Sequence, residues 1–275
     1  MQQQFLREAK DGVHSIYKIA NDTYRLDEKG IVNAYLLIGT KEALLIDTGN
    51  GLGNISETVK ELTDKDLNVV LTHRHGDHDG GSHQFQDVFC GRRDKKIVYD
   101  LLSCKISRQI ILACNKKNTK DRSHLHFTHG KYNPQYHFIS EGNGFDLGNR
   151  MVEVICTPGH TYGSIVYTDD KEGLMFTGDD VNPYMFLQLP GATSLSLWLR
   201  GAKRILALSE YYQAYMGHGD GLLTKETIAS IVKMGEELLA KGKKPFGMKQ
   251  QIIYPPMASK EDLNPHIFIT KGRIR

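Results

Sequence analysis

The sequence predicts an α/β fold in which polar turns follow the ends of β-strands. Short apolar runs of strand length alternate with segments of helical periodicity. Several of these runs end in turns that hold histidine or aspartate next to glycine. With 275 residues, 40% of them hydrophobic and 24% charged, the chain is large and apolar enough to build a packed core. The chain is therefore expected to be globular, with its functional groups on these turns.

Four strands are expected before residue 50, where apolar positions alternate or run together. They cover residues 13–19, 23–26, 33–38 and 43–46. A helix is expected to follow over 55–62, because Ile55, Val59 and Leu62 have helical spacing. The apolar run 68–71 predicts the next strand. The order strand, strand, helix, strand is typical of an α/β arrangement.

The rest of the chain repeats the pattern of apolar runs that end in polar turns. After a short helical stretch beyond Gly81, strands are expected at residues 88–90, 151–156, 165–168, 174–176 and 211–216, with a turn or short strand at 144–148. Helices are expected where apolar residues line one helix face, at residues 96–113, 196–208 and 224–240. The proline-containing tail from about residue 243 is expected to be irregular.

A dense cluster of ligand-type residues follows the run 68–71, since His73, His75, Asp77 and His78 fall within six positions. In an extended segment alternate side chains face the same way. His73, His75 and Asp77 can therefore converge while His78 opens to the other side, and the segment can serve two neighbouring metal ions. The alternative is a histidine-rich surface loop, but four ligand-type residues at this spacing favour a metal site.

Four further ligand-type residues also stand just past a strand-like run and next to glycine: Asp47, His160, Asp179 and His218. A sandwich of two sheets brings such strand ends to one rim. The expected ligands are His73, His75 and His160 for one metal ion, Asp77, His78 and His218 for a second, and Asp179 as a bridge between them. Both sets leave room for solvent and contain no cysteine, which suits a catalytic rather than a structural zinc site.

Five motifs resemble those of the metallo-β-lactamase superfamily, in its order. They lie at residues 45–49 (Leu-Ile-Asp-Thr-Gly), 73–81 (His-x-His-x-Asp-His-x-Gly-Gly), 157–161 (Thr-Pro-Gly-His-Thr), 176–179 (Phe-Thr-Gly-Asp) and 217–219 (Gly-His-Gly). The resemblance runs from about residue 13 to 240. It implies an αββα sandwich of two mixed β-sheets flanked by helices, with a dinuclear, usually zinc, site at one rim. It also implies that Asp47 orients the loop that carries the histidines and does not bind metal.

The resemblance implies a dinuclear zinc hydrolase that uses a metal-bridging hydroxide on an ester, thioester, lactone or phosphodiester. Two zinc ions are the expected cofactors, with iron or manganese as alternatives. True β-lactamases typically lack an aspartate at the bridging position, so Asp179 disfavours β-lactam hydrolysis. The rival hypothesis is a mononuclear iron oxidoreductase of the persulfide dioxygenase kind. A metal-stabilised binding module is a third and weaker hypothesis.

Two residues are expected to take part in the chemistry. Asp77 is expected to accept a hydrogen bond from the bridging hydroxide, or to shuttle its proton, while it remains a ligand. Tyr184, which follows Asp179 in the chain, is expected to reach the pocket and donate to an oxyanion. The alternative for Tyr184 is an aromatic ring that packs against the rim. The fold alone does not name the substrate.

A single domain is expected over residues 1–275, with a basic helical insertion at about 92–136. Eleven Lys or Arg residues stand against three Asp between Arg92 and Lys131, a local charge of +8 in a chain of net charge +3. One interpretation is an extra helix with a solvated basic face. The other is a lid over the site that attracts an anionic substrate. The histidines at 124, 126 and 129 are interpreted as surface residues.

Composition also limits the partners and the location. The small net charge makes nucleic acid an unexpected partner, so a small-molecule substrate is expected, anionic if the insertion is a lid. Four cysteines without a CxxC pair predict neither a zinc knuckle nor a disulfide scaffold. No signal peptide and no apolar run of membrane-spanning length are visible, so a cytoplasmic protein is expected. For the tail, a homodimer contact and a cap over the pocket both stay open.

Overall fold

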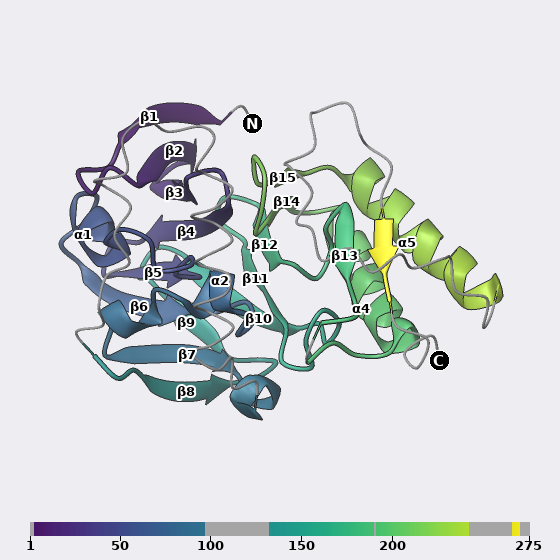
Figure 1. The fold of residues 1–275 in the computed structure, drawn as a ribbon. Helices are drawn as coiled ribbons and strands as arrows, with labels where there is room; N and C mark the ends of the chain where they lie inside the picture. Colours follow the sequence, from purple (N-terminus) through teal and green to yellow (C-terminus); the bar gives the residue numbers. More distant parts are fainter. Residues whose placement is uncertain (1–2, 97–131, 190, 242–265, 270–275) are drawn as a thin grey trace, which may run out of the picture.

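A computed structural model of the protein describes residues 3–96, 132–189, 191–241 and 266–269. Two mixed β-sheets form the centre of the structure, and helices lie on their outer sides (Figure 1). This αββα arrangement confirms the fold class that the sequence predicted. The segment 97–131, which carries most of the expected insertion and the histidines at 124, 126 and 129, lies outside the described residues.

The first sheet has eight strands that lie side by side in sequence order. They are β1 (Gln4–Glu8), β2 (His14–Ala20), β3 (Thr23–Glu28), β4 (Val32–Ile38), β5 (Glu42–Ile46), β6 (Asp66–Val70), β7 (Asp87–Gly91) and β8 (Gln135–Ile139). The strands from β1 to β5 pair antiparallel, whereas those from β5 to β8 are parallel neighbours. The carboxyl ends of β5, β6 and β7 therefore meet at one edge of the sheet.

The second sheet has six strands in the order β15-β14-β12-β11-β10-β9. They are β9 (Gly144–Asp146), β10 (Met151–Cys156), β11 (Ile165–Asp169), β12 (Leu174–Gly178), β14 (Gln213–Met216) and β15 (Leu222–Leu223). Both β10 and β12 run antiparallel to β11, and β14 runs parallel to β12. The turns that carry His160, Asp179 and His218 therefore leave the sheet from the same edge.

A small third sheet joins two distant parts of the chain. Strand β13 (Tyr184–Phe186) pairs in parallel with β16 (His266–Phe268). Strand β16 lies in the tail that the sequence predicted to be irregular. Ile267 and Ile269 pack against the same hydrophobic cluster as Met185. Residues 266–269 of the tail therefore lie beside the turn that follows Asp179.

Side-chain caps begin three of the described helices, α1 (Ile55–Lys60), α4 (Leu195–Leu208) and α5 (Lys225–Lys241). The described residues also form α2 (Gly76–Asp79) and the 3-10 helices η1 (Ser82–Gln84) and η2 (Arg92–Lys96). The Ser194 side chain caps α4 by accepting a hydrogen bond from Leu197 N. Trp198, Ala202 and Ile205, at helical spacing, are buried on one side of α4. None of the helices among the described residues is long and apolar enough to cross a membrane.

The core has three apolar layers. The middle layer contains residues of both sheets, among them Leu44 and Phe176, and so fixes how the sheets face each other. One outer layer joins α1 to the first sheet through Ile55, and the other joins α4 and α5 to the second sheet through Trp198. Burial of this apolar area is the main favourable term in folding. This packing fixes the position of the strand ends of one sheet relative to those of the other.

Each strand predicted in the described residues is present to within a few residues, as are the helices expected at 55–62, 196–208 and 224–240. The sequence did not indicate β1, β8, β13, β15, β16 or the short helix α2. Strand β8 begins at Gln135, inside the range expected for the insertion.

Candidate metal centre

Seven ligand-type side chains from four turns meet at one edge of the sandwich. One group consists of His73, His75 and His160, and the other of Asp77, His78, Asp179 and His218. In each group every residue offers one possible ligand atom, and these atoms all lie within 4.8 Å of one another. All of the residues predicted as ligands are thus brought together. Asp179 was expected between the two groups and falls geometrically with the second.

The first group is a compact set of three imidazoles. The His160 Nε2 atom lies 2.7 Å from His75 Nδ1, and the ring centroids of His73 and His160 are 4.8 Å apart. Burial and the neighbouring His75 lower the pKa of His160 to about 3. Burial, together with His78 and the other histidines, lowers the pKa of His73 well below its usual range. Neutral imidazole is the form that binds a metal ion.

The second group sets two carboxylates against two imidazoles. The His218 Nε2 atom lies 3.1 Å from Asp179 Oδ2 and 3.5 Å from Asp77 Oδ2. The His78 Nε2 atom lies 3.7 Å from Asp179 Oδ1. Burial lowers the pKa of His218, but the Asp179 carboxylate outweighs it and brings that pKa to about 9. The carboxylates thus favour positive charge opposite them, as a site for a divalent cation requires.

Asp179 contacts both groups. Its Oδ2 atom lies 3.1 Å from His218 Nε2 and 3.8 Å from His160 Nε2. Burial raises the pKa of Asp179, but His218 and His78 outweigh it and hold that pKa well below its usual range. The side chain therefore stays ionised between the two groups. A carboxylate in this position can offer one oxygen to each of two cations.

The buried polar atoms of the site test whether cations fit. His73 Nε2, His78 Nε2 and Asp179 Oδ1 are buried and have no hydrogen-bond partner within the described part of the chain. Buried polar atoms of this kind are rare in native proteins, because each costs about 1–3 kcal/mol unless it is paired. All three belong to the two groups and have lone pairs to offer. The donor set of nitrogen and carboxylate oxygen atoms suits zinc, so the residues fit the expected cations.

Asp47 lies outside both groups and supports them. Its Oδ1 atom accepts a hydrogen bond from Thr72 N at 2.7 Å, and its Oδ2 atom accepts one from Thr72 Oγ1 at 2.8 Å. The same Oδ2 lies 2.8 Å from His78 Nδ1, which leaves His78 Nε2 to face Asp179. This is the position from which a carboxylate orients a ligand histidine.

Asp180 supports the turn that carries His160, a role that was not predicted from the sequence. The Asp180 carboxylate accepts hydrogen bonds from His160 N at 3.1 Å and from Thr157 Oγ1. Its backbone carbonyl accepts a hydrogen bond from Trp198 Nε1 at 2.8 Å. Burial raises the pKa of Asp180 to about 7. A second aspartate directly after Asp179 was the available signal.

The His218 turn is fastened to the first sheet. The His218 Nδ1 atom donates to the Ile31 carbonyl at 2.7 Å. Asn33 Nδ2 donates to the Gly219 carbonyl at 3.2 Å, and the buried Arg25 donates to Asn33 Oδ1 at 2.9 Å. The bonds of His218 and Gly219 join residues 187 and 186 positions apart in the sequence. They fix the ring so that its Nε2 atom faces the two carboxylates.

Tyr184 lies at the start of β13, where its backbone N–H donates to Asn182 Oδ1 at 2.9 Å. Its side chain is half-buried. The expected role of Tyr184 as a donor to an oxyanion stays a prediction.

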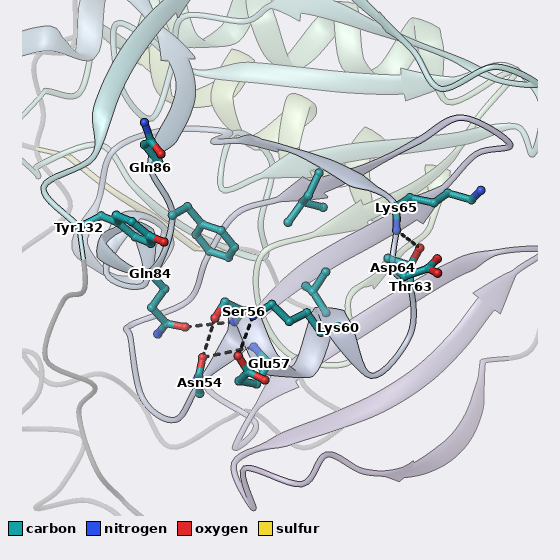
Figure 2. A pocket seen from close by; sticks show the side chains of 13 residues that line it. Asn54, Ser56, Glu57, Lys60, Thr63, Asp64, Lys65, Gln84, Gln86 and Tyr132 are labelled. Carbon is teal, nitrogen blue, oxygen red and sulfur yellow. Dashed lines mark hydrogen bonds and ion pairs between the residues drawn. The ribbon is translucent and has the colours of Figure 1, made fainter.

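A separate cavity of about 460 Å³ lies beside α1 (Figure 2). None of the seven ligand-type residues lines it. Several of its polar groups pair with one another: Ser56 N donates to Gln84 Oε1 at 3.1 Å, and Lys65 N donates to Thr63 Oγ1 at 3.2 Å. The cavity is thus distinct from the metal centre.

Comparison with known proteins identifies the family. The family model of the metallo-beta-lactamase superfamily matches residues 27–218, more than half of the chain. The chain belongs to the metallo-β-lactamase superfamily. A solved structure of a metallo-beta-lactamase superfamily protein from Sulfolobus tokodaii is similar, with a TM-score of 0.53 and 20% identity over 81% of this chain and 86% of that chain. This likeness shows that the fold is shared.

Two curated relatives within the superfamily carry thioesterase names. The acyl-coenzyme A thioesterase MBLAC2 of Gallus gallus is 25% identical over 190 residues, which are 64% of this chain and 67% of the relative. An atrochrysone carboxyl ACP thioesterase of Aspergillus terreus is 28% identical over 195 residues, 68% of this chain and 49% of the relative. The chain thus spans about half the length of the fungal relative. Both names are those of hydrolases, the class of enzyme that the sequence predicted for this chain.

Proposed function

We propose that this chain is a hydrolase with a two-cation centre that cleaves thioesters. The observation that carries the proposal is the convergence of His73, His75 and His160 with Asp77, His78, Asp179 and His218. Zinc is the expected metal, because imidazole and carboxylate ligands with an open position are typical of catalytic zinc. The iron oxidoreductase alternative needs only one metal ion, and a second complete group of ligand-type residues argues against it.

The two groups divide the work of binding. The first group would hold one cation through three imidazoles, and the second would hold another through two imidazoles and the Asp77 carboxylate. Asp179 would touch both cations. When bound, such a pair polarises the scissile carbonyl and acidifies a water molecule.

Asp77 is the proposed proton acceptor. Its side chain is 21% exposed, whereas that of Asp179 is 10% exposed, so Asp77 is the carboxylate of the centre that is more open to solvent. It can therefore hold the proton of an attacking water while one oxygen remains near His218. Tyr184 is proposed to donate a hydrogen bond to the developing oxyanion.

Thioesters are proposed in preference to esters, lactones and phosphodiesters because the curated relatives described above are named thioesterases. The local charge of +8 between Arg92 and Lys131 favours a substrate with an anionic carrier, since an excess of one sign of charge attracts the opposite sign. The proposed substrate is therefore a small acyl thioester with a negatively charged thiol component. Asp179, which true β-lactamases typically lack, keeps β-lactams disfavoured.

Metal content and substrate preference test the proposal together. Purified protein should contain two equivalents of zinc and should hydrolyse an acyl-coenzyme A probe faster than ester, lactone, phosphodiester and β-lactam probes. Treatment with a chelator should abolish turnover, and added zinc should restore it. Asp179→Asn should lose at least 100-fold in kcat, because one side chain serves both cations. A single bound iron with oxygen consumption, or near-normal turnover of Asp179→Asn, would overturn the two-cation proposal.

A further inference from the structure

A third buried carboxylate beside Asp47 and Asp180, that of Asp94, lies next to the metal centre without belonging to either group of ligand-type residues. It stands in η2, directly after β7, and its side chain is inaccessible to solvent. An ionised group in such a place is stable only with several hydrogen-bond donors around it. The partners of Asp94 therefore indicate what the residue does.

The Asp94 carboxylate accepts hydrogen bonds from two different loops. Its Oδ2 atom accepts one from Arg74 N at 3.1 Å and one from Thr161 Oγ1 at 2.9 Å. Its Oδ1 atom accepts one from Gly163 N at 2.7 Å. A Cβ atom on residue 163 would lie 2.4 Å from Asp94 Cγ, so the contact requires glycine there. The carboxylate thus fills a close-fitting position between the loops.

These two loops supply the whole first group. Arg74 stands between His73 and His75 in the chain, and Thr161 directly follows His160. The two loops also meet where Ile165 N donates to the Thr72 carbonyl at 2.8 Å, and Asp180 holds the His160 backbone. Asp94 adds a side-chain bridge between the loops beyond the ends of β6 and β10, next to the histidines themselves. The Asp94 carboxylate therefore ties the His73–His75 segment to the residue that follows His160.

The second group has different supports. Asp47 contacts His78, and the Ile31 carbonyl contacts His218. None of the hydrogen bonds of Asp94 given above reaches a residue of the second group. Asp94, after β7, thus supports only the first group through these bonds, whereas Asp47, after β5, contacts both His78 and Thr72, the neighbour of His73.

We propose that Asp94 is a positioning residue specific to the His73–His75–His160 group. The inference rests on the proposed function, in that this group binds a cation. A metal site keeps its affinity only when its ligands are held close to the right geometry, and groups that orient the ligands typically contribute 10–100-fold. Asp94 acts through Arg74, Thr161 and Gly163, and touches neither substrate nor metal.

Titration of the metal-free protein with Zn²⁺ or Co²⁺ alone tests this role without an activity assay. The wild-type protein should bind two equivalents. His160→Ala and His78→Ala identify which equivalent, and which Co²⁺ absorption band, belongs to each group. Asp94→Asn should lower by 10–100-fold the affinity for the cation equivalent that His160→Ala removes. The affinity for the other equivalent should stay unchanged. Thr161→Val removes one hydrogen-bond donor to Asp94 and keeps the carboxylate. It should lower the affinity for the same cation equivalent by a smaller factor.

Asp11→Asn is the matched control. Asp11 is also a mostly buried carboxylate that accepts backbone N–H groups, from Val13 and Asn54, but it lies at α1 away from the ligands. Asp11→Asn should leave the affinities for both cation equivalents unchanged, even if the melting temperature falls. If Asp94→Asn and Thr161→Val weakened both equivalents equally, or neither, the assignment of Asp94 would be wrong while the two-cation centre stood. A wild-type protein that binds fewer than two cations would instead defeat the proposed function itself.

Discussion

Asp47 Oδ2 and His78 Nδ1 lie 2.8 Å apart, and both side chains are buried. The pair connects the end of β5 to α2 and turns the other ring nitrogen of His78 toward Asp179. Asp47 also has a positive φ of 63°, a conformation that Asp and Asn tolerate better than other residues with a side chain. Identity at position 47 is therefore constrained twice, by the hydrogen bond and by the backbone.

Two substitutions separate these constraints. Asp47→Asn keeps the backbone preference and removes the charge, so the melting temperature should change little while kcat/KM falls about 10–100-fold. Asp47→Ala should lose activity to a similar degree and should also lose about 1 kcal/mol or more of stability through backbone strain. Thermal unfolding and thioesterase kinetics of both variants provide the measurement. Equal stability of the two variants would show that the backbone constraint is absent.

The next prediction concerns Gly217, where the chain passes close behind the second group. A Cβ atom there would lie 2.6 Å from His78 Cε1 and 2.8 Å from Asp179 Oδ1. Gly217→Ala should therefore displace one of these side chains and weaken the cation bound by the second group at least 10-fold. Titration of the metal-free variant with Zn²⁺ measures this loss, and unchanged affinity for both equivalents would contradict it.

Gly201→Ala serves as the control for the same chemical change. Gly201 lies within α4, where an added Cβ would meet its nearest neighbours on Thr157 at 3.5 Å, an ordinary contact. Alanine in a helix interior is favoured over glycine by about 1 kcal/mol. The melting temperature should rise by about 2–4 °C, with metal affinity unchanged.

The convergence of the seven ligand-type residues could be predicted from the sequence because their pattern is local. His73, His75, Asp77 and His78 fall in one short turn, and the other candidates each follow an apolar run next to glycine. Chain order and strand direction then suffice to bring them to one rim. The strands were predicted for the same reason, since alternation of apolar and polar residues is visible within a few positions.

Asp94 and Asp180 could not be predicted in this way. Each accepts hydrogen bonds from residues about 20 to 70 positions away, so its environment exists only after the sheets have formed. In the sequence, Asp94 is merely an acid within a basic run. Strand β16 was missed for a related reason. Its three residues form a strand only because β13 lies beside them.

The last prediction concerns the pH dependence of stability, through Glu28 at the end of β3. This side chain is buried, and its Oε2 atom accepts a hydrogen bond from Asn50 N at 2.8 Å. Burial raises the pKa of Glu28 from 4.5 to about 8. Between these values the folded chain keeps a proton that the unfolded chain releases. The stabilising contribution is therefore complete below pH 4.5 and is lost as the pH rises through 8.

Glu28→Gln replaces the ionisable carboxyl group by an amide and keeps an oxygen that can accept the hydrogen bond from Asn50 N. Between pH 5 and 8 the free energy of unfolding of the wild-type protein should fall as the pH rises. Its slope should be steeper than that of the variant by up to about 1.4 kcal/mol per pH unit. Urea unfolding at several pH values, with chelator present so that metal binding does not contribute, measures both slopes. Parallel slopes would mean that Glu28 is ionised in the folded chain throughout this range. In that case the pairing of Oε2 with Asn50 N would have to compensate for the burial of a full charge.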